Sequence, residues 1–165
     1  TKARANAKKL EAKNVDFRLG EIEHLPVEDG IVDVILSNCV VNLSPDKGAV
    51  FQDAFRVLKP GGRLAISDVV KLQALPRAIE DDLLALTGCV SGAATVDAIR
   101  ELLGAAGFED IRVEVSEASK EAIQCWLPGS GMENYVASAT IEAVKPGGKK
   151  KACCGPTCCA PENKA

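Results

Sequence analysis

Apolar residues along the chain follow two spacings, one typical of strands and one typical of helices. Strands are expected where apolar residues run together or alternate, at residues 15–19, 32–36, 63–70, 111–115 and 135–144. Helices are expected where apolar residues recur every three or four positions, at residues 1–13, 45–59, 75–86 and 96–106. The run at 32–36 is apolar except for Asp33, which is typical of a strand covered on both faces in a parallel sheet.

Short polar residues, prolines and glycines mark the ends of these elements. Ser44-Pro45 predicts an N-cap followed by proline at the first helical position, and Pro60-Gly61-Gly62 predicts the end of that helix. Thr95 predicts the cap of a later helix, and Gly107 predicts its C-terminal end. The helix boundaries are therefore expected from side-chain chemistry as well as from periodicity.

Strand and helix alternate three times, and two strands close the ordered part of the sequence. This order predicts an α/β fold with a mostly parallel sheet and an antiparallel last strand. We expect one domain over residues 1–144, because 165 residues with 47% hydrophobic content bury one substantial core. Residues 145–165 are rich in lysine, cysteine, glycine and proline, and are expected to form a disordered tail.

The charge and cysteine content narrow the function classes. The net charge is −3, and the basic residues do not gather in a stripe with aromatic residues, so no nucleic-acid partner is expected. No apolar run approaches the roughly 20 residues that span a bilayer, and no secretion signal is recognised at the N-terminus, so a cytoplasmic protein without a membrane partner is expected. Seven cysteines in a reducing compartment favour thiols, metal or metalloid ligands, or redox groups over structural disulfides.

Two internal cysteines are placed where chemistry is expected in such a sheet. Ligands of open α/β sheets bind beyond the carboxyl ends of the strands, which is where Asn38 and Cys39 follow the strand at 32–36. Cys89 lies in a glycine-flanked break after a helix that is expected to return to the same edge. The alternative is that both cysteines are small buried hydrophobic residues, a frequent fate of free thiols.

Several segments resemble one enzyme family. The segment from Arg56 to Asp68, RVLKPGGRLAISD, preceded by GEIEHLP at 20–26, resembles the second half of class I S-adenosylmethionine-dependent methyltransferases. The segments SNCVVNLSPDKGAVFQDAFRVLKPGG and TGCVSGA are similar to the arsenite methyltransferases. The resemblance extends over nearly the whole chain and implies a Rossmann-like sheet.

The resemblance also implies a chemistry and a set of site residues. It implies S-adenosylmethionine as cofactor, with Glu21 and Ile22 at the adenine and Asn38 near the methionine part. It implies that Cys39 and Cys89 are the catalytic thiolates, which bind trivalent arsenic delivered as a thiol conjugate, with thioredoxin or glutathione as reductant. Soft metalloids prefer thiolate ligands, which is consistent with this assignment. Arsenic then attacks the sulfonium methyl group through its lone pair, so no general base is required.

The remaining cysteines and the single histidine leave alternatives open. Cys125 is compatible with a third arsenic ligand or with packing, and His24 with a catalytic or a solvated loop residue. The tail has two adjacent cysteine pairs, which are compatible with soft-ion binding or with an exposed, redox-sensitive segment: Cys153, Cys154, Cys158 and Cys159. Their spacing does not match a structural zinc site.

The chain departs from the family pattern at its front. The family's first two strands, its glycine-rich turn and its further upstream cysteine are not recognised. We therefore expect residues 1–144 to be the C-terminal part of a methyltransferase domain whose isolated form is inactive and binds the cofactor poorly, with unpaired strand edges and exposed apolar faces. Two other functions remain open: a non-catalytic, thiol-rich protein that binds arsenic or soft metals, and a class I methyltransferase of an organic small molecule.

Overall fold

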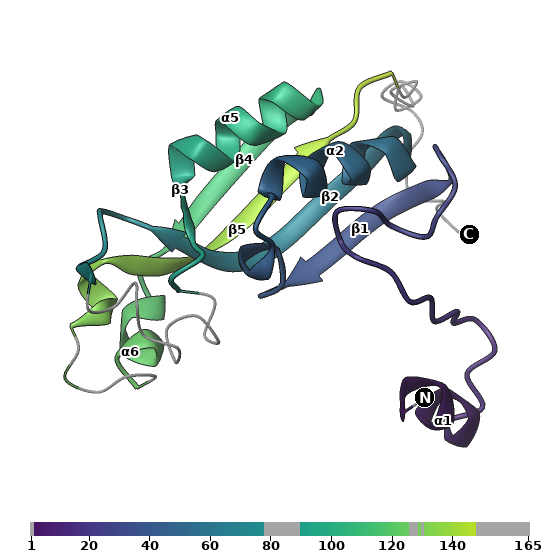
Figure 1. Ribbon diagram of the computed structural model, residues 1–165, viewed down its shortest axis with the longest axis horizontal. Helices are drawn as coiled ribbons and strands as arrows, with labels where there is room; N and C mark the ends of the chain where they lie inside the picture. Colours follow the sequence, from purple (N-terminus) through teal and green to yellow (C-terminus); the bar gives the residue numbers. More distant parts are fainter. Residues whose placement is uncertain (1, 78–89, 126–128, 130, 148–165) are drawn as a thin grey trace, which may run out of the picture.

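A computed structural model describes residues 2–77, 90–125, 129 and 131–147, and these form one twisted sheet with helices packed on it (Figure 1). The strands lie in the order β1 (Val32–Asn38), β2 (Leu58–Lys71), β5 (Val136–Val144) and β4 (Glu109–Ser116), and the short β3 (Ala94–Thr95) pairs with β2. β1 and β3 are parallel to β2, whereas β5 is antiparallel to both β2 and β4. Four strands therefore share one direction and the last one opposes them, which confirms the predicted fold class.

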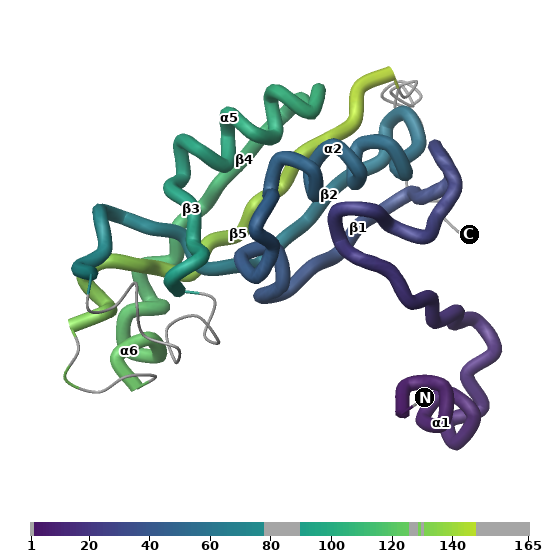
Figure 2. The backbone as a smooth tube through the Cα atoms, in the orientation of Figure 1, coloured from purple at the N-terminus to yellow at the C-terminus, as the bar shows by residue number. Residues whose placement is uncertain are grey.

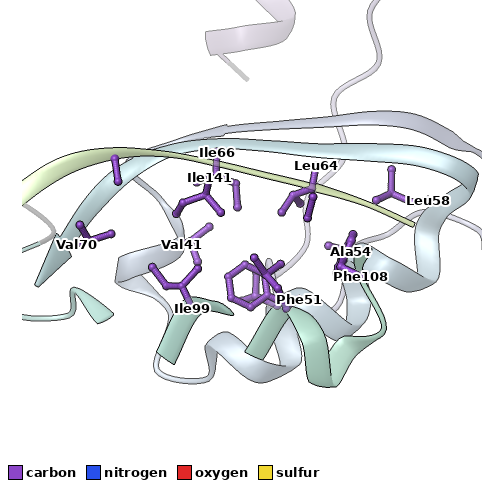
Figure 3. Close-up of a cluster of buried hydrophobic side chains, with 14 residues drawn as sticks. Val41, Phe51, Ala54, Leu58, Leu64, Ile66, Val70, Ile99, Phe108 and Ile141 are labelled. Carbon is purple, nitrogen blue, oxygen red and sulfur yellow. The ribbon is translucent and has the colours of Figure 1, made fainter. Parts of the chain in front are cut away.

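Two helices, α2 (Lys47–Val57) and α5 (Val96–Ala106), pack on the same face of the sheet. The main core lies between them and the sheet, and Figure 3 shows Leu64 and Ile66 of β2 pointing from the sheet toward Phe51 of α2. Each of these side chains is at most 2% exposed. Burial of one such side chain stabilises a fold by about 1.5–3 kcal/mol, so this cluster anchors both helices on the sheet.

The second face of the sheet is more polar and more exposed. Leu36, Ala65 and Glu142 follow one another across β1, β2 and β5 on this face, as their strand register places them. Leu36 is 78% exposed, and β1 is an edge strand of the described sheet. The exposed apolar side chains and the unpaired edge expected from the sequence are therefore present around β1.

The helix caps agree with the sequence at α5 and differ at α2. Thr95 Oγ1 accepts a hydrogen bond from the Ala98 amide at 3.2 Å, and Gly107 ends α5 with φ of +100°, as predicted. At α2 the N-cap is Asp46, whose carboxylate accepts from the Ala49 amide at 2.9 Å. The prediction that Ser44 caps this helix is wrong, because α2 begins at Lys47 and not at Pro45. The Ser44 hydroxyl is hydrogen-bonded to the Glu23 carboxylate and accepts from the Asp46 amide at 3.1 Å.

The strand predicted at residues 15–19 does not form, and this prediction is also wrong. The segment is extended without pairing, and Leu19 is 98% exposed. A strand needs a neighbour to accept its hydrogen bonds, and none of the described strands lies beside this segment. The predicted N-terminal helix is α1 (Lys2–Lys9), which has no buried residue and stands apart from the sheet (Figure 2).

The connection between β4 and β5 contains α6 (Ser119–Gln124) and the short 3-10 helix η2 (Met132–Asn134), neither of which was predicted. Ile123 of α6 and Met132 of η2 are buried in a second apolar cluster with Val69 and Val136. Most of the helix predicted at residues 75–86 lies outside the described residues, and so does the part of the predicted tail from residue 148 onward.

The beginning of the predicted tail is attached to the sheet. Lys145 pairs through its backbone with Gly61 and Gly62, at 2.8 and 2.9 Å. Its ammonium donates to the carbonyls of Phe55 and Leu58 at 2.7 and 2.8 Å, at the C-terminal end of α2. A cation is favoured at that end of a helix, so the folded part extends at least to Lys145.

Candidate active site

An apolar cleft of about 320 Å³ opens at the carboxyl end of β1. It lies between the last residues of β1, the inner face of α2 and the loop at residues 20–30. Its polar lining residues are Ser37 and Asn38, and the others are apolar: Ile22, Leu25, Ile35, Leu36, Val40, Val41, Val50, Phe51, Ala54, Leu64 and Ile66. A mostly apolar cleft with polar groups at one end is typical of a small-molecule site.

The cleft brings together two of the three predicted cofactor residues. Ile22 enters it from the loop and Asn38 from the end of β1. Glu21 is exposed, lies next to Ile22 in the chain, and forms an isolated backbone bridge with His24. Their roles at the adenine and the methionine part stay predictions.

Cys39 follows β1 directly and lies between two residues that line this cleft, Asn38 and Val40. Its amide donates to the Ser67 carbonyl at 2.9 Å, which extends the pairing of β1 with β2 by one residue. Its φ of +53° then turns the chain away from the sheet, a conformation that is uncommon for a residue with a side chain. The thiol is exposed and lies 3.8 Å from Asn38 Oδ1, to which it donates.

The electrostatic surroundings of Cys39 disfavour its thiolate. Partial burial of the side chain raises the pKa of the Cys39 thiol, and the negative charge of Asp68 raises it further. Burial also raises the pKa of the Asp68 carboxyl, although hydrogen bonds from the Val69 and Asn42 amides act in the opposite direction. A ligand that binds the thiolate must therefore displace the proton of a thiol more basic than usual.

A pair of charged residues on α2 holds the loop that forms one wall of the cleft. Asp53 accepts from the Leu25 amide at 2.6 Å, and Arg56 donates to the carbonyls of Leu25 and Val27 at 3.0 and 2.8 Å. Asp53 and Arg56 are themselves paired at 2.7 Å. The pairing with Arg56 lowers the pKa of the Asp53 carboxyl and raises that of the Arg56 guanidinium. This Asp53–Arg56 clamp fixes residues 25–27, three positions after Ile22.

Two further contacts position the loop at residues 20–30. Glu23 is hydrogen-bonded to Ser44, which lowers the pKa of the Glu23 carboxyl and ties the loop to the segment before α2. A side chain at Gly20 would lie 2.6 Å from the ring of Pro26, so only glycine fits at the start of this loop. The loop is therefore attached to α2 and to the segment before it through Glu23, Leu25 and Val27.

The segment after Cys39 forms the 3-10 helix η1 (Val41–Leu43), which is held by Asp68 at the carboxyl end of β2. Asn42 donates from its side chain to Asp68 Oδ1 at 2.8 Å and to the Val69 carbonyl at 2.6 Å. Neither Asn42 nor the Asp53–Arg56 clamp was identified from the sequence. A lone asparagine in the apolar run VVNL was the available signal for Asn42, and an Asp and Arg three positions apart on one helix was the signal for the clamp.

The structure leaves several predicted thiols undescribed. Cys89 lies outside the described residues, as do four tail cysteines: Cys153, Cys154, Cys158 and Cys159. Cys125 is exposed at the end of α6, and His24 is exposed in the loop at residues 20–30.

Across residues 2–77 and the other described segments, no group of three or more His, Cys, Asp or Glu side chains is arranged to hold a metal ion. Among the same residues, no helix is both long and apolar enough to cross a bilayer.

Known proteins with similar sequences include arsenic-methylating enzymes. A family profile described as a methyltransferase domain matches residues 1–107. The arsenite methyltransferase of Halobacterium salinarum is 52% identical over 146 residues, which make up 88% of this chain and 37% of that protein. The chain thus spans little more than a third of the length of this relative.

Solved structures agree with the fold. CrArsM from Chlamydomonas reinhardtii, described as an arsenic(III) S-adenosylmethionine methyltransferase, aligns with a TM-score of 0.57 and 30% identity over 79% of this chain and 44% of that chain. A second structure is that of phosphoethanolamine N-methyltransferase 2 of Haemonchus contortus, solved with S-adenosyl-L-methionine. It aligns with a TM-score of 0.68 and 18% identity over 88% of this chain and 40% of that chain. At this identity, the match shows similarity of fold alone. Because the family profile matches more than half of its residues, the chain belongs to the methyltransferase domain family, within the class I S-adenosylmethionine-dependent methyltransferases.

Proposed function

We propose that this chain carries the methyl-transfer centre of an arsenite methyltransferase, in which Cys39 is a thiolate ligand of trivalent arsenic. The observation that carries the proposal is the 52% identity to the Halobacterium salinarum arsenite methyltransferase over 88% of the chain. The position of the Cys39 thiol, exposed at the carboxyl end of β1 beside the cleft, supports it. Because the chain spans 37% of that relative, the activity is proposed for the protein expressed from its complete open reading frame.

The residues of the cleft fit S-adenosylmethionine in chemical character. Ile22 and Leu25 offer an apolar wall suited to a flat ring system, whereas Asn38 and Ser37 offer polar groups suited to an amino-acid part. Glu21, at the edge of the same loop, would accept a hydrogen bond from the exocyclic amine of adenine. When bound, the cofactor supplies a methyl group on a positively charged sulfur atom, which the lone pair of trivalent arsenic can accept without a general base.

The chain's own contribution is to bind and orient the arsenic. Trivalent arsenic is soft and exchanges its thiol or hydroxyl ligands for protein thiolates, and the protons of those thiols leave with the displaced ligands. Cys39 would hold it beside Asn38, and Cys89 would supply a second thiolate. Holding two reactants in line lowers a reaction barrier by roughly 7–11 kcal/mol. The protein therefore contributes to the reaction by positioning arsenic and the methyl group.

The proposed partners follow from the electron count. Methylation by a lone pair raises the formal oxidation state of arsenic by two, so two electrons are needed before another round, from one dithiol or from two monothiols that are oxidised to a disulfide. Thioredoxin or glutathione is the proposed reductant. We also propose a cytoplasmic location, where protein thiols are kept reduced and available for arsenic.

Replacement of the two cysteines tests the proposal. We expect Cys39→Ser or Cys89→Ser to abolish arsenite methylation while S-adenosylmethionine still binds with unchanged affinity in calorimetric titration. Cys125→Ser, an exposed thiol at the end of α6, is the matched control and is expected to keep the activity. Full methylation by both active-site variants would rule the assignment out.

The other functions give different results in the same experiment. A non-catalytic arsenic-binding protein would bind arsenite through its thiols but yield no methylated arsenic by chromatography. A methyltransferase of an organic small molecule would bind the cofactor, and Cys39→Ser would have little effect on it.

A further inference from the structure

The chain directly after Cys39 is held by a buried polar contact that the proposed chemistry does not use. Asn42 is 5% exposed and Asp68 is 2% exposed, although one is polar and the other carries a carboxyl group. The Asn42 amide and side chain donate to the two carboxylate oxygens of Asp68 at 3.3 and 2.8 Å, and the Val69 amide also donates to Asp68 at 2.8 Å. Buried polar groups persist when they are paired, so this network fixes η1 against the end of β2.

Cys39 lies between two fixed points. Ahead of it, β1 is paired with β2 as far as Asn38 and Ser67, and the Cys39 amide adds one more bond to the Ser67 carbonyl. Three residues after it, Asn42 is held by Asp68 on the same strand β2. A φ of +53° is costly for cysteine and persists only where the surrounding structure enforces it. The two attachments to β2 supply this constraint.

A third contact comes from the segment that leads into β3. An added Cβ at Gly92 would lie 2.1 Å from the Asn42 carbonyl oxygen, far inside any allowed contact. Val90, two positions before Gly92, and Ala93, directly after it, are buried, so this segment cannot easily move away. Gly92 is therefore the residue that lets two loops at the carboxyl edge of the sheet meet backbone to backbone.

We infer that Asn42, Asp68 and Gly92 are positioning residues that hold the Cys39 thiol in the orientation in which it binds arsenic. This inference rests on the proposed function. Groups that orient a ligand without touching the bound atom typically change affinity or activity by roughly 10–100-fold when they are removed. The same range is expected here for the KM of arsenite.

Two glycine substitutions make a matched pair for the test. In the protein expressed from its complete open reading frame, Gly92→Ala is expected to raise the KM for arsenite roughly 10–100-fold and to leave the KM for S-adenosylmethionine within about twofold. Gly104→Ala is the control, because nothing lies within 4 Å of its added Cβ on the exposed side of α5. It is expected to leave both KM values unchanged.

A second readout does not depend on arsenic. Trypsin releases Cys39 in the peptide 19–47, where it is the only cysteine, so its rate of alkylation by iodoacetamide can be followed by mass spectrometry. Asn42→Ala and Gly92→Ala are expected to speed this alkylation roughly fivefold, the factor that corresponds to one lost hydrogen bond. Gly92→Ala acts on the same segment through a different contact, so it serves if Asn42→Ala does not fold.

The outcomes separate this inference from the function it rests on. If the wild-type protein does not methylate arsenite, the proposed function fails, and the alkylation rates still decide whether these residues hold Cys39. If the wild-type protein is active but Gly92→Ala and Asn42→Ala match it in both the KM for arsenite and the alkylation rate, the inference is overturned. A loss shared equally with Gly104→Ala overturns it as well.

Discussion

The Asp53–Arg56 clamp gives the sharpest stability prediction, because it joins α2 to the loop that walls the cleft. The perturbation is Asp53→Asn, which keeps the shape of the side chain and removes its charge. Asp53 is 9% exposed and accepts three hydrogen bonds, from the Leu25 amide at 2.6 Å and from Arg56 at 2.7 and 3.0 Å. The asparagine retains one oxygen and turns an NH2 group toward a guanidinium N–H.

The magnitude follows from the bonds that are lost. One hydrogen bond to a charged group contributes about 1.5–3 kcal/mol. The Arg56 side chain is 34% exposed and keeps its bonds to two carbonyls and to Asp29, so water and these partners offset part of the loss. We expect Asp53→Asn to lower the free energy of unfolding by about 1.5–2 kcal/mol at pH 7. Asp29→Asn removes an exposed partner of the same arginine and should cost less than about 0.5 kcal/mol.

Urea unfolding followed by circular dichroism measures both variants, and pH adds a second test. Arg56 lowers the pKa of folded Asp53 below its ordinary value of 3.8. The stabilising contribution of the ionised Asp53 carboxylate is therefore present above pH 3.8 and is lost as the pH falls through the lower pKa of the folded state. The difference between wild type and Asp53→Asn should shrink below that pH. A cost equal to that of Asp29→Asn, or one that is the same at pH 3 and pH 7, would refute the reasoning.

Three further measurements address Cys39 and the packing of the helices. Burial and the charge of Asp68 raise the pKa of the Cys39 thiol, so its alkylation in the folded protein should reach half-maximal rate at a higher pH than in the unfolded chain. Asp68→Asn should lower that midpoint, and an unchanged midpoint would contradict the effect assigned to Asp68. Gly104→Ala should raise the free energy of unfolding by about 0.5–1 kcal/mol, since alanine is the better helix former and its Cβ has no atom within 4 Å. A lower free energy of unfolding in urea would count against the described position of α5. Phe108→Leu should lower the free energy of unfolding by about 1–2 kcal/mol in the same assay, because it removes the edge-to-face contact between Phe108 and Phe55, whose two ring centroids are 5.2 Å apart. A decrease of less than about 0.5 kcal/mol would contradict this packing.

Elements set by local sequence were predicted from the sequence, and elements set by distant partners were not. The apolar run of β1 and the Thr95 and Gly107 caps of α5 depend on neighbouring residues, and each forms where expected. Residues 15–19 have the alternation of a strand, but alternation does not supply a pairing partner. At α2, both Ser44 and Asp46 are chemically suitable caps, and the sequence does not show that the helix begins at Lys47 with Asp46 as its cap or that Ser44 contacts Glu23, 21 residues away.

The residues of the candidate site also divide into those that the sequence predicted and those that it did not. The rule that ligands bind at the carboxyl ends of parallel strands was enough to place Asn38 and Cys39 at the cleft. The residues that hold this edge in place were missed, because their pairing joins distant parts of the chain: Asn42 and Asp68 are 26 residues apart. The left-handed φ of Cys39 was also not predictable, since cysteine has no preference for it and the surrounding contacts impose it.

The central claim is that thiol-bound arsenic receives a methyl group beside the cleft at the end of β1. The most direct measurement uses S-adenosylmethionine with a trideuterated methyl group, together with arsenite and a dithiol reductant, and analyses the arsenic products by chromatography and mass spectrometry. For the protein expressed from its complete open reading frame, the account predicts trideuteromethyl arsenic from the wild type and none from Cys39→Ser. Equal yields of the labelled product from both proteins, or no labelled arsenic from the wild type, would contradict it.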